Sequence, residues 1–317
     1  MKAIVYEEFG SVDVLKFEEM ERPIPKDDEL LVKVHATSVN AIDIVFRSGA
    51  KLLYGITKLM AGFKKPKVKI LGVDVSGEVD AVGKKVTNFK KGDLIYGASR
   101  NHGAYAEYLC IPEKNTAIKP ANMSHEEAAA VPSAACTALH GLRDKISIQE
   151  GQKVLIYGGS GGVGTYAIQI ARLFTSEVTA VCSTDKLSNA QSLGAKAVID
   201  YTKENFTKNG QTYDVIFDAV GRKKISYSDC KNSLSEKGIF VTVDLESVVF
   251  KQIRNKKIKS FMASVITEKL DFLREQIEAG KIKSVVEKVF PLRQTAEAHK
   301  YYEKGHLKGK VVINVLE

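Results

Sequence analysis

KVLIYGGSGGVG, residues 153–164, is a short apolar run followed by a cluster of glycines. Residues 154–157 form the uniformly apolar stretch typical of a parallel strand that is buried on both faces, and apolar residues recur at helical spacing from 167 to 174. A strand that enters a helix through a glycine-rich turn is typical of the phosphate-binding start of a dinucleotide fold. The alternative is a glycine turn with a purely structural role.

The glycines of this GxGxxG pattern have different predicted tasks. Gly159 permits the tight turn, Gly161 lets the backbone approach a pyrophosphate, and Gly164 lets the new helix pack closely on the strand. The helix N-terminus then faces the phosphate charge. The predicted cofactor-binding residues of the turn are Gly159, Ser160, Gly161, Gly162, Val163 and Gly164.

Composition predicts an ordinary soluble protein of two domains. The chain has 317 residues, of which 44% are hydrophobic and 27% charged, and this length exceeds the usual size of one hydrophobic core. The longest apolar stretches are only as long as a strand, and the first residues resemble neither a signal peptide nor a transit peptide, so we expect no membrane span and a cytoplasmic location. Four isolated cysteines without a CxxC pair indicate neither a zinc ribbon nor a disulfide framework.

The chain is basic, with a formal net charge of +9 and clusters of lysine and arginine at residues 64–69 and 254–259. Such charge is also found in proteins that bind nucleic acid or membrane surfaces. Here lysine dominates and no aromatic side chains lie between the basic ones, and a phosphate-rich cofactor would itself favour a positive field. We therefore expect no nucleic-acid partner, and keep as the alternative a non-catalytic NADPH-binding protein that binds nucleic acid or a membrane surface.

The pattern of elements changes near residue 124. Before it, short strands alternate with turns, which predicts a small β-rich domain. From Ser124, which with Glu127 forms a capping-box pattern, strands and helices alternate as in a doubly wound parallel sheet. The predicted strands are Ala3–Tyr6, Glu29–Ala36, Val73–Val82, Asp93–Tyr96 and Tyr105–Ile111, then Lys153–Tyr157, Glu177–Cys182, Ala197–Ile199, Val215–Ala219 and Gly238–Val243.

The end of the chain is predicted to return to the first domain. After a helix near Glu268–Glu278, the stretches Lys283–Phe290 and Lys310–Val315 again have the character of strands. We therefore predict an α/β protein in which residues 1–123 and 284–317 form the β-rich domain and residues 124–283 form the doubly wound one.

The residues after the second strand of the doubly wound domain favour NADPH. An NAD-type carboxylate belongs near position 182 or 183, where this chain has a thiol and a hydroxyl, so Asp185 is predicted to lie in the first turn of the next helix. Ser183, Thr184 and Lys186 then remain to meet the ribose, and a lysine with hydroxyls suits a 2′-phosphate. The alternative for Lys186 is an exposed helix lysine.

Six motifs together resemble the medium-chain dehydrogenase/reductase superfamily, in its zinc-independent branch similar to quinone oxidoreductases and zeta-crystallin. They are VNAID with RSG (residues 39–43 and 47–49), GVDVSGEV with VG and GD (72–79, 82–83 and 92–93), GAYAEY (103–108), AAAVP with TA (128–132 and 137–138), FDAVG (217–221) and GKVV (309–312). The resemblance covers essentially the whole chain. It implies a GroES-like first domain joined to a Rossmann domain, an active site in the cleft between them, and a homodimer.

The resemblance also assigns roles to residues. It implies that Thr137, Ala219, Val220 and Gly221 lie beside the cofactor, and that Lys186 and Tyr201 flank the 2′-phosphate. Asn40 and Asp43 would line the nicotinamide and substrate cleft as the candidate catalytic residues. The alternatives are that Asn40 satisfies buried backbone groups and that Asp43 forms an ion pair with Arg47.

Comparison with the zinc alcohol dehydrogenases of the same superfamily indicates that no metal is bound. Where those enzymes have a ligand cysteine and Gly-His-Glu, this chain has Asn40 and Gly72-Val73-Asp74, and neither asparagine nor valine is a usual zinc ligand. Without a Lewis acid the chemistry suits an activated acceptor, a quinone or an α,β-unsaturated carbonyl, that takes a hydride from NADPH. The alternative within enzymes is a zinc-independent alcohol or aldehyde oxidoreductase.

Two features depart from the family pattern. Val45 and Phe46 stand where many relatives carry a tyrosine that points to the substrate. The stretch Ala50–Ile70 is longer than usual and has apolar residues at near-helical spacing. It is predicted either to cap the cleft and influence substrate choice or to pack as a helix on the domain surface or the dimer.

Overall fold

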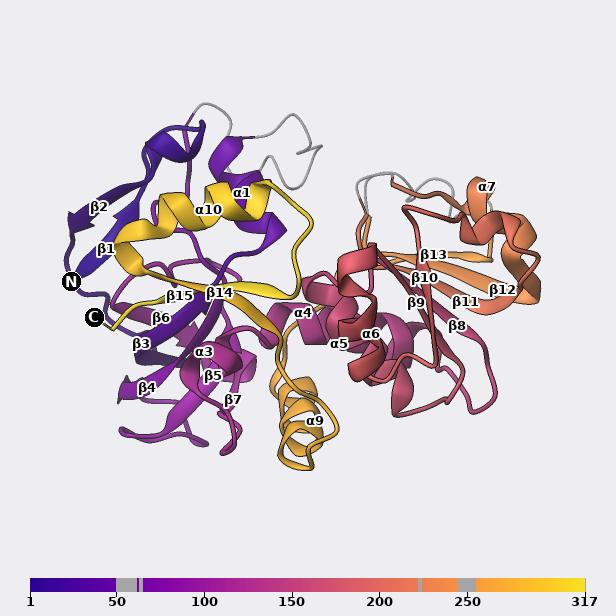
Figure 1. Ribbon diagram of the computed structural model, residues 1–317. Coiled ribbons are helices and arrows are strands. Elements are labelled where there is room, and N and C mark those ends of the chain that lie inside the picture. Colours follow the sequence, from indigo (N-terminus) through magenta and orange to yellow (C-terminus); the bar gives the residue numbers. More distant parts are fainter. Residues whose placement is uncertain (50–61, 63–64, 222–223, 245–254, 317) are drawn as a thin grey trace.

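The computed structural model describes residues 1–49, 62, 65–221, 224–244 and 255–316. They form two lobes, a β-rich one and one built on a parallel sheet, with helices α4 (Pro132–Leu139) and α5 (Gly162–Arg172) beside their junction (Figure 1). The fold is therefore α/β with a separate β-rich domain, as the sequence predicts. Most of the apolar stretch within Ala50–Ile70 lies outside the described residues.

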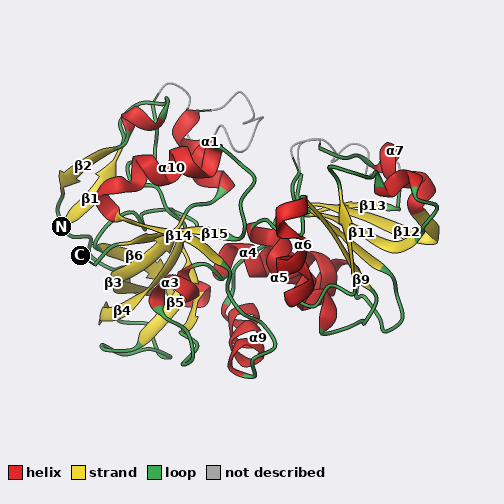
Figure 2. Cartoon of the chain, in the orientation of Figure 1, coloured by secondary structure: helices red, strands yellow, loops and turns green. Residues whose placement is uncertain are grey.

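The second lobe is built on a six-stranded parallel sheet with the strand order β10-β9-β8-β11-β12-β13. Because the order reverses at β8, ligands are expected at the carboxyl end of that strand. Helices pack against this sheet (Figure 2). The strands are β8 (Val154–Tyr157), β9 (Val178–Cys182), β10 (Ala197–Asp200), β11 (Tyr213–Asp218), β12 (Leu234–Thr242) and β13 (Ile258–Ser260), and the further helices are α6 (Leu187–Ser192), α7 (Tyr227–Cys230) and α9 (Thr267–Glu278).

The first lobe is a mostly antiparallel sheet with the order β14-β15-β3-β4-β5-β7, in which β6 also pairs with β3. Its strands are β3 (Glu29–Ser38), β4 (Asp74–Val82), β5 (Leu94–Ala98), β6 (Tyr108–Pro112), β7 (Thr116–Ile118), β14 (Val286–Pro291) and β15 (Lys310–Asn314), with a separate hairpin of β1 (Lys2–Val5) and β2 (Lys16–Glu19) and helices α1 (Ala41–Ser48), α3 (His125–Ala129) and α10 (Thr295–Glu303). The predicted return of the chain is confirmed, because β15 pairs antiparallel with β3.

Three short strands, β2, β7 and β13, were not predicted, and the strand predicted at Tyr105–Ile111 begins only at Tyr108. These segments have few residues and little alternation, so a local pattern cannot identify them. The predicted capping box is confirmed: Ser124 Oγ accepts from the Glu127 N–H, and the Glu127 carboxylate accepts from the Ser124 N–H. The domain boundaries at residues 123/124 and 283/284 stay a prediction.

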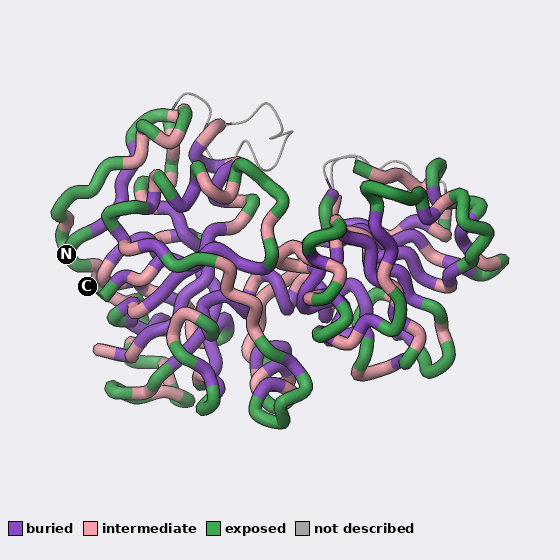
Figure 3. Tube along the Cα trace, in the orientation of Figure 1, coloured by how far each residue is buried: buried purple, intermediate pink, exposed green. Residues whose placement is uncertain are grey.

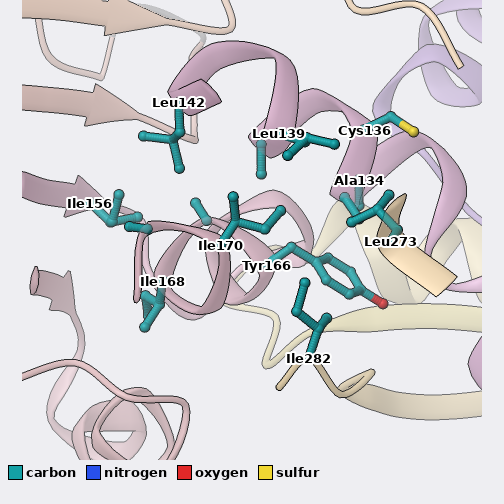
Figure 4. Packing of buried hydrophobic residues seen from close by; sticks show 14 of the residues in the cluster. Ala134, Cys136, Leu139, Leu142, Ile156, Tyr166, Ile168, Ile170, Leu273 and Ile282 are labelled. Carbon is teal, nitrogen blue, oxygen red and sulfur yellow. The ribbon is translucent and has the colours of Figure 1, made fainter. Parts of the chain in front are cut away.

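One apolar cluster contains residues of helices α4, α5 and α9, of the parallel sheet and of strands β5 and β7, and α9 packs against α4 and β7. Small buried side chains of α4 allow close contact with α5, where Tyr166 and Ile170 are fully buried, and Leu273 of α9 joins the same cluster (Figure 4). The buried residues follow the strands through the centre of each lobe (Figure 3). The Tyr96 hydroxyl of β5 donates to the Leu270 carbonyl of α9 at 2.6 Å, which ties the two lobes together.

Candidate functional site

The turn after β8 is made by Gly158, which corrects the prediction for Gly159. Gly158 has a φ of +79°, in the left-handed region that favours glycine, whereas Gly159 has no positive φ. A Cβ on Gly158 would lie 2.3 Å from Val220 Cγ2, and a Cβ on Gly159 would lie 3.0 Å from the Ala180 Cβ of β9. Gly158 therefore turns the chain, and Gly159 permits packing between neighbouring strands. With two adjacent glycines, the pattern alone cannot indicate which of them turns.

The start of helix α5 fits a phosphate group. Gly161 is the N-cap, no side chain caps the helix, and its first turn carries no acidic residue. A Cβ on Gly161 would meet only the Gly158 carbonyl at 3.6 Å, whereas a Cβ on Gly164 would lie 2.0 Å from that oxygen. Gly164 thus packs directly on the turn, and Gly161 leaves open space in front of the helix N-terminus. The amides and the helix dipole there favour an anion.

A segment from the other lobe lies on this turn. We call residues His306–Lys310 the C-terminal strap. The Gly309 N–H donates to the Ser160 carbonyl at 2.9 Å, and Gly309 forms an isolated bridge with Gly161. Gly309 has a φ of +101°, and a Cβ there would lie 2.0 Å from the Val285 carbonyl. The strap therefore closes one side of the glycine turn through a close backbone contact.

Asn40 lies at the centre of a buried polar cluster. Its Nδ2 donates to Asp74 Oδ2 at 3.0 Å, and its Oδ1 accepts from Lys310 Nζ at 2.6 Å. Lys310 Nζ also donates to the Val39 carbonyl at 3.3 Å and lies 3.6 Å from Asp74 Oδ2. The amide of Asn40 is thus oriented by a carboxylate on one side and an ammonium on the other. Burial lowers the pKa of Lys310, and the carboxylates of Asp74 and Asp43 oppose that effect.

Asp74 joins this cluster to helix α4. Its carboxylate, which is fully buried, accepts from Ser38 Oγ at 2.7 Å, from Ser133 Oγ at 2.5 Å and from the Ser133 N–H at 2.9 Å. Thr137, one turn further along α4, donates its hydroxyl to the Ser133 carbonyl at 2.7 Å. Asp74 therefore links strands β3 and β4, the start of β15 through Lys310, and helix α4, which carries the predicted cofactor residue Thr137.

Asp43 lies beneath Asn40 and is fully buried. Its carboxylate accepts from the Asn40 N–H at 2.9 Å, as the partner in a capping box, and from the Gly72 N–H at 3.0 Å. The alternative ion pair with Arg47 is wrong, because Arg47 donates two hydrogen bonds to Glu303 instead. Asp43 therefore positions the backbone of Asn40 and presents no surface to a substrate.

A directed hydrogen-bond chain runs behind Asp43. Arg47 Nη1 lies 3.2 Å from His299 Nδ1, and His299 Nε2 lies 3.0 Å from the Tyr105 hydroxyl, which hydrogen-bonds to Asp43. Because arginine only donates, His299 Nδ1 accepts and Nε2 carries the proton. Burial lowers the pKa of His299 to about 4, so the imidazole stays neutral at physiological pH.

We expect the protein to lose stability as the pH falls from 6.5 to 4. The folded-state pKa of His299, about 4, is below its unfolded value of 6.5, so only the unfolded chain takes up this proton in that window. The free energy of unfolding then falls by up to about 1.4 kcal/mol per pH unit for this histidine. His125, whose pKa burial lowers to about 4, contributes in the same direction. Urea unfolding of wild type and His299→Gln at several pH values measures the effect, and an unchanged slope in the variant would contradict it.

The residues predicted for the ribose lie near one another after β9. Asp185 is in the first turn of a short helix at Thr184–Lys186, as predicted. The hydroxyl of Ser183 donates to Asp185 at 2.6 Å, and that of Thr184 donates to Asp200. Lys186 is only 5% exposed, so the alternative of an exposed helix lysine is wrong.

The C-terminal strap reaches these residues too. Lys186 Nζ donates to the carbonyl of His306, and the hydroxyl of Tyr201 lies 3.5 Å from His306 Nδ1. Tyr201 itself is 45% exposed. The strap therefore runs from Lys186 and Tyr201 at His306, past Ser160 at Gly309, to Asn40 at Lys310.

The loop Ala219–Gly221 is fixed by a buried carboxylate. Asp218, at the end of β11, accepts from the N–H groups of Val220 and Gly221 at 3.0 Å each and from the Thr242 hydroxyl at 2.8 Å. Burial raises the pKa of Asp218, and these three donors oppose that effect. Gly221 has a φ of +65°. Asp218 thus fixes the backbone of this loop, with Val220 against Gly158 at the glycine turn.

Most of the predicted residues are joined by these contacts, from Asn40 through the strap to the glycine turn and the loop of Val220. Sequence reasoning did not single out four further residues, Asp74, Asp218, His306 and Lys310. Asp74, Asp218 and Lys310 lie inside motifs of the family resemblance, so those motifs could have indicated them. His306 lies in no such motif. At the position of the family tyrosine, Val45 is partly buried against the core of the first lobe. The next residue, Phe46, is buried, with its ring centroid 4.3 Å from that of His102.

No group of three or more histidine, cysteine, aspartate or glutamate side chains in the described part of the chain could hold a metal ion. No described helix combines the length and apolar character needed to cross a membrane.

Comparison with known proteins identifies two family regions. Residues 26–121 match the alcohol dehydrogenase GroES-like domain, and residues 193–313 match the zinc-binding dehydrogenase family. The chain is 36% identical to 2-methylene-furan-3-one reductase of Solanum lycopersicum, and the match spans 99% of this chain and 79% of the relative. It is 35% identical, with the same coverage of each chain, to the chloroplastic NADPH-dependent alkenal/one oxidoreductase of Arabidopsis thaliana. The structure is similar to that of the quinone oxidoreductase from Coxiella burnetii, with a TM-score of 0.89, 31% identity and 99% coverage of both chains.

Proposed function

The chain belongs to the medium-chain dehydrogenase/reductase family, and from this premise we propose that it is an NADPH-dependent reductase of quinones or α,β-unsaturated carbonyls that works without a metal. Its relatives identify it as an NAD(P)H-dependent oxidoreductase of the quinone and alkenal reductase type. Homodimer assembly and a cytoplasmic location belong to the proposal as well. The Arabidopsis relative is named as chloroplastic, so the location needs its own measurement.

One observation carries the metal-independent part of the proposal. The ammonium of Lys310 lies between Asn40 Oδ1 and Asp74, next to positions 40 and 73, where the resemblance implies that the zinc enzymes carry metal ligands. A fixed cation at this place supplies positive charge and repels a second cation. The residue types at positions 40 and 73 also support a metal-independent enzyme, because asparagine and valine are unusual zinc ligands.

The residues present fit a dinucleotide. The amides at the start of α5 would bind the pyrophosphate, and Lys186 with Tyr201 would contact the 2′-phosphate. The loop of Val220 would hold the cofactor beside the glycine turn. When bound, the reduced nicotinamide supplies a hydride, which suits an acceptor whose negative charge can delocalise onto oxygen. Asn40, oriented by Asp74 and Lys310, is the polar group that would position the acceptor.

Turnover measurements test this proposal directly. Oxidation of NADPH, with NADH in parallel, would be followed against a para-quinone, an ortho-quinone, an alkenal, a cyclic enone and a simple aldehyde, with and without a chelator. Turnover of quinones or enones that is indifferent to the chelator is the expected result. Turnover confined to the aldehyde would favour the alcohol or aldehyde oxidoreductase. Cofactor binding without any turnover would favour the non-enzymatic alternative.

Lys186→Ala is expected to weaken NADPH binding by about tenfold or more and to leave NADH binding nearly unchanged, because only NADPH carries the phosphate that this ammonium would meet. Fluorescence titration of both cofactors measures the change. Lys196→Ala is the matched control, since Lys196 is an exposed lysine of the same lobe that pairs with Glu177. Equal losses for NADPH and NADH would contradict the role of Lys186.

A further inference from the structure

The C-terminal strap carries a histidine to the predicted 2′-phosphate site. His306 is exposed, and its Nδ1 lies 3.5 Å from the Tyr201 hydroxyl. Its backbone has a φ of +55°, in the left-handed region, which is unusual for a residue other than glycine. The carbonyl of this residue accepts a hydrogen bond from Lys186 Nζ. A side chain predicted for the phosphate thus also holds His306 in its uncommon conformation.

We propose that His306 is a specificity-determining residue whose imidazolium form binds the 2′-phosphate beside Lys186 and Tyr201, so that the preference for NADPH over NADH increases as the pH falls through the range in which histidine titrates. The proposal rests on the proposed function and adds a residue from the other lobe to the 2′-phosphate site. Histidine is the side chain that ordinarily changes charge between about pH 5 and 8.

The charges around His306 agree with this role. Lys186 and Asp185 face it from the short helix after β9, and Asp185 interacts electrostatically with it. Tyr201 faces it from the turn after β10, and Lys308 lies on the strap itself. A dianionic phosphate that enters between Lys186 and Tyr201 would favour the protonated imidazole, since an opposite charge within a few ångströms favours the charged form. NADH brings no such charge.

The geometry also gives Lys186 a second effect. Because its ammonium bonds to the His306 carbonyl, removal of this side chain would free His306 as well as remove a phosphate contact. His306→Asn separates the two effects, since it keeps Lys186 and replaces the imidazole with a side chain that tolerates the left-handed region. Lys308→Ala is the matched control, because it removes a permanent charge from the same strap and leaves the titrating group in place.

Isothermal titration calorimetry with NADP⁺ and NAD⁺, at about pH 6.5 and about pH 8.5, tests the proposal. For wild type, we expect the ratio of NADP⁺ affinity to NAD⁺ affinity to be roughly three- to tenfold higher at the lower pH than at the higher one. His306→Asn should lose most of this change in the ratio. Lys308→Ala should shift NADP⁺ affinity similarly at both pH values. The phosphate also titrates near pH 6, but it does so in every variant, so the difference between wild type and His306→Asn isolates the histidine.

The possible results distinguish failure of the role of His306 from failure of the proposed function. If wild type and His306→Asn have the same pH dependence while both bind NADP⁺ and NAD⁺, the role of His306 is overturned and the proposed function stands. If wild type binds neither dinucleotide, both are overturned. Binding in buffers of different ionisation enthalpy adds a second readout, because wild type should take up more protons with NADP⁺ than His306→Asn does.

Discussion

Gly164→Ala is expected to abolish cofactor binding and to lower the free energy of unfolding by about 3 kcal/mol. A Cβ at this position would lie 2.0 Å from the Gly158 carbonyl and 2.9 Å from the Gly159 Cα, and both atoms belong to backbone that cannot rotate away. Helix α5 would have to move away from β8, which would displace its N-terminal amides from the site predicted for the pyrophosphate. Urea unfolding and fluorescence titration with NADPH measure the two effects.

Gly162→Ala is the control for this prediction. Its Cβ would meet Lys310 Cδ at 3.0 Å, and a shift of a few tenths of an ångström in this one methylene chain relieves the contact while the ammonium keeps its partners. The control should therefore keep most of the stability of the wild type. If Gly164→Ala were as stable as Gly162→Ala and bound NADPH normally, the close packing of helix on turn would not be what the site requires.

Asp74→Asn is expected to lower the free energy of unfolding by about 3–5 kcal/mol, because it removes the carboxylate from a buried pair and leaves the Lys310 ammonium without its counter-charge. Both side chains are nearly or fully buried. The change would also loosen Asn40, whose amide donates to Asp74, so turnover should fall more than cofactor binding. Chemical unfolding gives the stability, and steady-state kinetics gives the separate changes in kcat and KM.

A double-mutant cycle tests the cause. In the Asp74→Asn background, Lys310→Met removes the unpaired charge and fills a similar volume, so it should restore a large part of the lost stability. The same Lys310→Met change in the wild-type background should destabilise the protein, because it leaves the Asp74 carboxylate unpaired. If the two changes were simply additive, the ion pair would carry no coupling energy and the explanation would fail.

The fold could be predicted from local patterns wherever an element is long and strongly patterned. The run from Val154 to Gly164 predicts a strand, a turn and a helix, and the structure has all three. The capping box at Ser124 and the return of the chain at Lys310 were also predictable. The glycine with the left-handed backbone could not be predicted, because Gly158 and Gly159 can both adopt a positive φ. Only the packing of Val220 against Gly158 in the folded structure distinguishes the two.

The candidate site could be predicted only in part. Asn40, Lys186 and the glycine turn stand next to elements that locate them. Lys310 and Asn40 are separated by 270 residues, and Lys186 and His306 by 120, so these pairs exist only once the whole fold has formed. The burial of Asp43 could not be predicted from the sequence either. The sequence allows its carboxylate to line the substrate site or to pair with Arg47, and only the packed structure shows that it is fully buried beneath Asn40.

The C-terminal strap has a consequence for the order in which the protein can be assembled during synthesis. Residues 306–310 are synthesised after the other segments of the candidate site, and β15 must then pair with β3, in which Ser38, the partner of Val312, precedes it by 274 residues. A pairing over such a separation forms slowly. The nascent chain can complete its parallel sheet while His306 and Lys310, which contact Lys186 and Asn40, are still missing from the site. At the proposed site, the glycine turn and the residues predicted for the 2′-phosphate would therefore be brought together by the strap only after this last segment has docked.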